Sequence, residues 1–144
     1  AWEFFSTPKN LSKITPGHMG FKILYISGGD KAYAGQIIRY HVSILPGLKV
    51  HWVTEITQVK EPVYFIDEQR FGPYALWHHQ HHFKEVPGGV EMTDEVNYSI
   101  PLGIIGRLAH FIIVGREVNR IFEHRFKVLE KYFSNDRKGF LKTA

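Results

Sequence analysis

Between residues 21 and 100, apolar and polar side chains alternate in short runs that are separated by turn residues. A period of two is typical of β-strands, because successive side chains of a strand point to opposite faces. Pairs such as Pro46-Gly47 and Gly88-Gly89 interrupt the runs at short intervals. The pattern therefore predicts an antiparallel meander. Its six predicted strands cover residues 21–27, 32–45, 48–59, 63–70, 75–86 and 89–100.

A period of three to four residues replaces this alternation at both ends of the chain. Residues 1–15 predict two short helices, of which the second runs from Pro8 to Ile14, since proline favours the first turn of a helix. Gly103–Phe133 predicts one long amphipathic helix. Its apolar stripe contains Ile104, Leu108, Phe111, Gly115, Val118, Phe122, Leu129 and Phe133. An α+β fold follows, in which this helix covers one face of the antiparallel sheet.

The strand around residues 77–83 contains four of the nine histidines in the chain. Alternation places Trp77, His79, His81 and Phe83 on one face and His78, Gln80 and His82 on the other. Large aromatic residues favour burial, so the first face is predicted to point inward and His78 and His82 toward solvent. The hairpin at Gly88-Gly89 then brings Asp94 of the next strand close to the two inward histidines.

Three interpretations of His79, His81 and Asp94 remain open. The first is a structural hydrogen-bond network, because buried polar groups need partners. The second is the polar end of a ligand cavity. The third, ranked last, is a metal site, because two histidines and a carboxylate form a known ligand set. The same residues could also carry out general acid–base catalysis, with Asp94 fixing the tautomer of a histidine.

Several other side chains are predicted to face the space between sheet and helix. Tyr40, Trp52 and Phe65 are inward-facing on neighbouring strands, and Asp67 shares a face with Phe65. Plain core packing is the competing role for the aromatic residues. Arg107 and His110 could reach the mouth of a cavity. The complete predicted ligand-binding set is Tyr40, Trp52, Phe65, Asp67, Trp77, His79, His81, Asp94, Tyr98 and Phe111.

Composition narrows the function classes. The 144 residues correspond to a single domain over 1–144, and the absence of cysteine excludes disulfides and thiol catalysis. The net charge of +4 is modest and accompanies no nucleic-acid-binding motif. Neither a signal peptide nor an apolar run long enough to span a bilayer is present, so we expect a cytoplasmic protein without membrane insertion. No cofactor motif is present, and no cofactor is predicted.

Four segments of the chain resemble a known family. They are Ala1-Trp2-Glu3-Phe4-Phe5 to Ile14-Thr15-Pro16, Phe65-Ile66-Asp67-Glu68-Gln69 to Gly72-Pro73-Tyr74, Trp77 to Phe83, and Gly88-Gly89 to Pro101-Leu102-Gly103, with Ile121-Phe122 and Arg125 fitting as well. The chain resembles the START/Bet v 1-like superfamily (SRPBCC, polyketide cyclase and lipid transport), and within it an uncharacterised bacterial ligand-binding subfamily.

This resemblance implies a helix-grip fold, in which a curved sheet wraps around a long C-terminal helix. The family sheet has seven strands, the first of which precedes the first helix, so a seventh N-terminal strand is expected beyond the six seen here. An unpaired sheet edge would otherwise promote a homodimer.

The resemblance also implies a cavity between the sheet and the C-terminal helix. Relatives carry lipids, sterols and plant metabolites, or act as aromatase/cyclases. The first functional hypothesis is therefore binding of a hydrophobic or aromatic small molecule. The alternative is a cyclase, aromatase or dehydratase with a His/Asp acid–base pair in the same cavity, and whether the chain is an enzyme stays open. The third is a protein-interaction module with a filled core.

Overall fold

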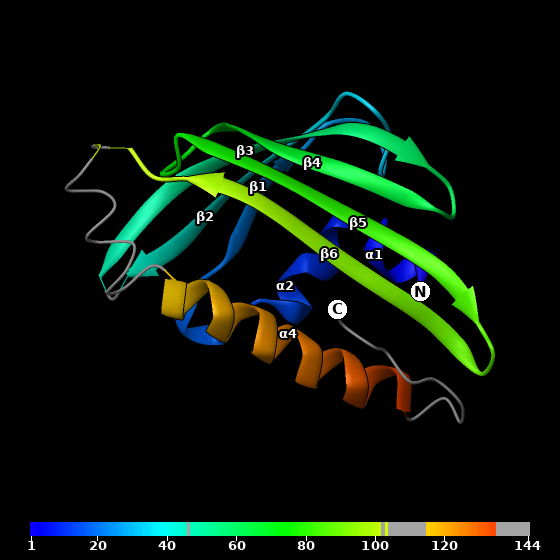
Figure 1. Ribbon diagram of the computed structural model, residues 1–144. Helices are drawn as coiled ribbons and strands as arrows, with labels where there is room; N and C mark the ends of the chain where they lie inside the picture. Colours follow the sequence, from blue (N-terminus) through cyan, green and yellow to red (C-terminus); the bar gives the residue numbers. More distant parts are fainter. Residues whose placement is uncertain (46, 102, 104–114, 135–144) are drawn as a thin grey trace.

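A single antiparallel sheet dominates the computed structural model of the chain, which describes residues 1–45, 47–101, 103 and 115–134. Its six strands follow one another in consecutive order from β1 to β6 (Figure 1). They are β1 (Lys22–Ile26), β2 (Gln36–Leu45), β3 (Leu48–Lys60), β4 (Tyr64–Phe71), β5 (Leu76–Val86) and β6 (Gly89–Ser99). Each strand pairs with the next in the chain, as expected for a meander of strands joined by short turns.

The described helices lie on one side of this curved sheet (Figure 1). The N-terminal segment contains α1 (Trp2–Phe5), the 3₁₀ helix η1 (Pro8–Asn10), α2 (Leu11–Ile14) and the 3₁₀ helix η2 (Gly17–Met19). The long helix α4 (Gly115–Ser134) crosses below the sheet and contacts α2. None of the helices in the described ranges has the length and apolar character needed to cross a membrane.

The core lies between the sheet and the helices because the inward face of each strand is apolar. In β3, Trp52, Thr54 and Ile56 are buried while the residues between them are half-buried. A second, smaller cluster joins the N-terminal segment to α4, where Leu129 packs with Phe4 and Ile14. The main cluster on the inward face of the sheet also includes Phe5 of the N-terminal segment and Ile121 of α4, so the sheet packs against both helical segments.

The predicted fold class is wrong as stated. The described residues form a six-stranded sheet with β1 and β6 at its edges, not a seven-stranded one. Four short helical segments replace the two predicted at the N-terminus. Pro8 separates α1 from η1 and Pro16 separates α2 from η2, because a preceding helical turn does not continue into proline. The segments η1 and α2 follow each other directly and together span the predicted helix Pro8–Ile14. What holds is the coarser description: an α+β, broadly helix-grip-like arrangement of an antiparallel sheet and one long C-terminal helix.

Two predicted element boundaries also differ. The strand predicted over 32–45 begins only at Gln36, because Gly35 has a φ of 93°, in the left-handed region that does not continue a strand. Of the helix predicted over Gly103–Phe133, the structure describes Gly115–Ser134 as helix α4. Most of the preceding part, residues 104–114, lies outside the described residues, together with Arg107, His110 and Phe111.

Candidate functional site

A cavity of about 270 Å³ lies between the concave face of the sheet, the N-terminal segment and α4. Its walls are mainly apolar and aromatic. The sheet contributes Tyr40, Trp52, Phe65 and Trp77, the N-terminal segment contributes Phe4, Phe5 and Leu11, and α4 contributes Val118, Ile121 and Phe122. A cavity with such walls suits an apolar ligand, with orientation provided by the few polar groups that reach it.

The polar groups of the cavity come from three neighbouring strands. His79 and His81 are two residues apart on β5 and therefore share its inward face. In the strand register, Asp67 of β4 is the partner of His79, and Asp94 of β6 is the partner of His81. Residues directly opposite each other on paired strands project to the same face. The sheet register alone thus brings two histidines between two carboxylates.

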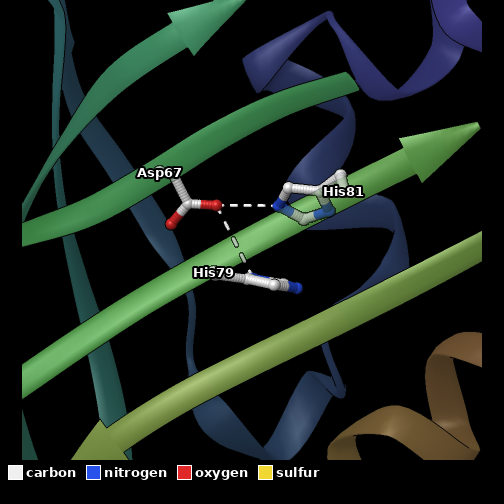
Figure 2. A group of neighbouring side chains, drawn as sticks. All are labelled: Asp67, His79 and His81. Carbon is white, nitrogen blue, oxygen red and sulfur yellow. Dashed lines mark hydrogen bonds and ion pairs between the residues drawn. The ribbon is translucent and has the colours of Figure 1, made fainter. Parts of the chain in front are cut away.

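Each imidazole lies close to both carboxylates. His81 Nε2 is 2.7 Å from Asp67 Oδ2, and His79 Nε2 is 3.0 Å from Asp94 Oδ1. Figure 2 shows Asp67 directed at both rings, with His79 Nδ1 at 3.6 Å. His81 Nδ1 lies 2.8 Å from Asp94 Oδ1, an ion-pair distance without hydrogen-bond alignment. The two rings are in contact, with centroids 3.8 Å apart.

The two histidines respond differently to these surroundings. Burial and the charge of His81 lower the pKa of His79, and its contacts with Asp94 and Asp67 only partly oppose them. Burial also acts to lower the pKa of His81, but its contacts with Asp67 and Asp94 outweigh burial and raise it. At neutral pH His79 is therefore neutral, and His81 is the member of the pair that keeps its proton to the higher pH.

Both carboxyl groups remain ionised in this cluster. Burial acts to raise the pKa of Asp67 and of Asp94. The hydrogen bonds from the histidines and the positive charges of His81 and Arg125 prevail, so the pKa of Asp67 is lowered and that of Asp94 lies well below its usual value. Two carboxylates thus face the guanidinium of Arg125 and the two imidazoles, of which His81 is the more readily protonated.

Arg125 completes the cluster from the opposite wall. It projects from α4, is 9% exposed, and places Nη1 3.6 Å from Asp94 Oδ2, which is too long for a hydrogen bond. Its guanidinium carbon lies 5.4 Å from the centre of the Phe122 ring. Within the described ranges, Arg125 Nε, Arg125 Nη1 and the indole Nε1 of Trp52 have no hydrogen-bond partner.

Three of these side chains offer a possible set of metal ligands. One ligand atom each from Asp67, His79 and His81 lies within 4.8 Å of the others. The residue types suit a divalent transition metal. The carboxylate in this set is Asp67, whereas sequence reasoning named Asp94. A metal at this position would have to replace the hydrogen bond between His81 Nε2 and Asp67 Oδ2.

Of the ten residues predicted to bind a ligand, seven line the cavity: Tyr40, Trp52, Phe65, Asp67, Trp77, His79 and His81. Asp94 supports them from β6 by bonding to His79 and lying beside Arg125. Tyr98 packs against Tyr74 and Trp77 and is not among the described residues that line the cavity. Phe111 lies outside the described residues.

The remaining histidines of β5 lie on the outer face, as alternation predicts, but they are half-buried rather than fully exposed. His78 Nδ1 is 3.2 Å from Glu68 Oε1, and His82 Nε2 is 3.1 Å from Gln80 Oε1. Glu68 also pairs with Arg70. A second polar network thus covers the back of the strands that carry the site.

Sequence reasoning missed two contributors to the site. Arg125 was not predicted as a site residue, although it occupies the gap between Phe122 and Leu129 in the apolar stripe, and an arginine on an apolar stripe is a usable signal. The N-terminal residues Phe4, Phe5 and Leu11 also line the cavity. Their contribution depends on how the N-terminal segment folds under the sheet, which no local pattern encodes.

The fold and site together define an α+β domain with one antiparallel sheet, a long C-terminal helix and a cavity between them. The chain matches no protein-family model and no curated protein. Among solved structures it is similar to the protein TTHA0849 from Thermus thermophilus, with a TM-score of 0.59 and 17% identity. The similarity covers 90% of this chain and 86% of the other. At this identity the likeness concerns the fold alone.

Proposed function

We propose that this chain binds a hydrophobic or aromatic small molecule in the cavity between the sheet and α4. The observation that carries this proposal is the cavity itself, about 270 Å³ in volume and walled by aromatic residues of β2 to β5 and apolar residues of α4. Typical ligand sites measure roughly 300–1,000 Å³, and this cavity lies just below that range, so it suits a small ligand. The sequence resemblance to START/Bet v 1-like ligand carriers supports the same function, as a proposal.

Filling the cavity tests this function. Val118 is buried on α4 and lines the cavity, so Val118→Trp introduces a ring into the space that the ligand would occupy. Tyr132→Trp on the same helix is a matched control, because Tyr132 is 52% exposed. We expect the neutral fluorescent probe N-phenyl-1-naphthylamine to bind the wild type and Tyr132→Trp with equal affinity. Val118→Trp should bind it at least about 10-fold more weakly, a loss of about 1.4 kcal/mol.

The test has a clear negative outcome. Equal probe affinity in Val118→Trp, in a protein that unfolds cooperatively near the wild-type temperature, would mean that the probe binds elsewhere. The same wild-type protein can be compared by mass spectrometry under native and denaturing conditions. A retained small molecule would appear as additional native mass that Val118→Trp lacks.

A second candidate function is acid–base catalysis of a cyclase, aromatase or dehydratase reaction. The specific observation in its favour is that His79 and His81 have oppositely shifted pKa values, which provides one base and one acid. The geometry argues for binding instead, because both nitrogens of each ring lie next to a carboxylate oxygen, through one hydrogen bond and one ion-pair contact each. Conversion of a retained ligand by the wild type, and its loss in His79→Gln with binding kept, would favour catalysis.

We make two further proposals, on the cellular location of the protein and on its association into a homodimer. A cytoplasmic location stays a prediction from the sequence, which fractionation of the native host would test. The edge strands β1 and β6 are the surfaces through which a homodimer would form, because an edge strand exposes unpaired backbone groups. Analytical ultracentrifugation at several protein concentrations would detect the homodimer. A protein that stays monomeric at all of them would contradict this proposal.

A further inference from the structure

Hydrogen-bond donors without partners mark one part of the cavity. Arg125 Nε, Arg125 Nη1 and Trp52 Nε1 are buried and have no partner within the described part of the chain. The residues are 9% and 7% exposed, so bulk water does not solvate them freely. A buried donor without an acceptor is costly, and a charged one more so. Both side chains line the cavity that we propose as the ligand site.

These groups select for one kind of partner. Arginine and the tryptophan indole are donors only, so they cannot bond to the donor of a ligand. Their complement is an oxygen acceptor, and for Arg125 a negatively charged one, because charge-assisted hydrogen bonds are the stronger kind.

Asp94 is not the acceptor for these donors of Arg125. Its Oδ1 accepts from His79 and lies beside His81, while its Oδ2 remains 3.6 Å from Arg125 Nη1. The carboxylate balances the guanidinium charge but leaves its donors unused. The guanidinium carbon lies 5.4 Å from the centre of the Phe122 ring, so one face of the group packs near this aromatic ring.

We propose that the ligand is an amphiphilic acid: an apolar or aromatic body that bears an anionic oxygen group, such as a carboxylate, bound by Arg125. A second oxygen of the same molecule accepts from the indole N–H of Trp52. This inference rests on the proposed ligand-binding function and specifies its ligand class. The apolar walls bind the body and Arg125 orients the anionic end.

A matched pair of probes distinguishes binding of an apolar body in the cavity from binding of an anionic group by Arg125. N-phenyl-1-naphthylamine is neutral, and 1-anilinonaphthalene-8-sulfonate adds an anionic oxygen group to the same ring skeleton. We expect the wild type to bind the sulfonate at least about 10-fold more tightly than the neutral probe, as one charge-assisted contact allows. Arg125→Met should remove this preference, which is measured within the variant as the ratio of its affinities for the two probes.

The control is Arg116→Met, because Arg116 is exposed on the same helix. Arg116→Met and Arg125→Met change the net charge by the same amount, so a general electrostatic effect on probe binding would appear in both variants. An unchanged preference in Arg125→Met, or an equal loss in Arg116→Met, would overturn the assignment of Arg125.

A measurement on the wild type avoids any folding defect of the variants. The ¹H–¹⁵N signals of the Arg125 Nε–H and Trp52 Nε1–H groups report on their acceptors. Both are expected to shift on addition of the sulfonate probe, and the arginine signal should not shift with the neutral probe. Identical responses to the two probes would overturn the proposal.

The outcomes distinguish this inference from the proposed function. If neither probe binds the wild type more tightly than it binds Val118→Trp, the ligand-binding function itself fails. If the neutral probe binds in the cavity and the sulfonate gains nothing, only the anionic ligand class fails.

Discussion

His79 and His81 show how position within a cluster sets the charge of a side chain. They share one face of one strand and the same two carboxylates, yet the pKa of one is lowered and that of the other is raised. The difference follows from distance. His81 lies within 2.8 Å of both carboxylates, whereas His79 lies 3.0 Å from one and 3.6 Å from the other. Once His81 is charged, it opposes protonation of His79.

Removing His81 should change how stability depends on pH. Because its folded-state pKa is raised, its contribution is fully present below the ordinary histidine pKa of about 6.5 and is lost as the pH rises through the folded pKa. We expect the free energy of unfolding of the wild type to fall over this interval, and the fall to disappear in His81→Gln. Urea unfolding of both proteins at a series of pH values measures this dependence of the free energy of unfolding on pH.

The control for this prediction is His82→Gln on the outer face of the same strand, which should keep the wild-type profile. His79 acts in the opposite sense at lower pH, since its lowered pKa makes its contribution decline as the pH falls below about 6.5. A His81→Gln profile that still declines as the pH rises above about 6.5 would contradict the assignment of the raised pKa.

At the scale of the elements, the sequence predicted the strands and the helical face because a period of two or of 3.6 is a local property. Register between strands is not local. In the pairing of β4 with β5, Asp67 lies opposite His79. The offset between two strands decides which residues lie opposite each other, and alternation along a single strand does not give that offset. Sequence reasoning therefore placed Asp67 on the correct face but not between the two histidines, and it named Asp94 as the carboxylate of the possible metal set.

The helix α4 stabilises the N-terminal segment through Leu129. This side chain is 4% exposed and packs with Phe4 and Ile14. We expect Leu129→Ala to lower the free energy of unfolding by about 2–5 kcal/mol, through lost burial and a new cavity. Thermal or urea unfolding measures the change, with Lys131→Ala as an exposed control on the same helix. A loss similar to that of the control would show that the N-terminal segment does not depend on this contact.

The whole molecule resembles a curved sheet closed from one side by two helical segments (Figure 1). The cavity belongs to this arrangement and to no single element, since its lining comes from the N-terminal segment, β2 to β5 and α4. Sequence reasoning identified most of the sheet residues because they alternate. It missed the N-terminal contribution because contacts between distant segments leave no periodic signal.

A ligand that binds only the folded molecule should raise its stability as a whole. Saturation at 100 times the dissociation constant corresponds to about 2.7 kcal/mol at 25 °C. We expect N-phenyl-1-naphthylamine to raise the unfolding temperature of the wild type in proportion to the logarithm of its concentration. The Val118→Trp variant should show no such increase. Equal increases in both would place the stabilising site outside the cavity.

The two networks on opposite faces of β4 and β5 have a consequence for how this chain can evolve. Asp67, His79 and His81 lie on the cavity side of the sheet, while Glu68 and His78 lie on the reverse side. Single substitutions can alter either network alone. Insertion or deletion of one residue in β5 would exchange the faces of every residue beyond it, moving outer charges into the core and aromatic walls into water. Homologous sequences should therefore vary in residue type along β5 while keeping its length, and insertions and deletions should accumulate in the turns.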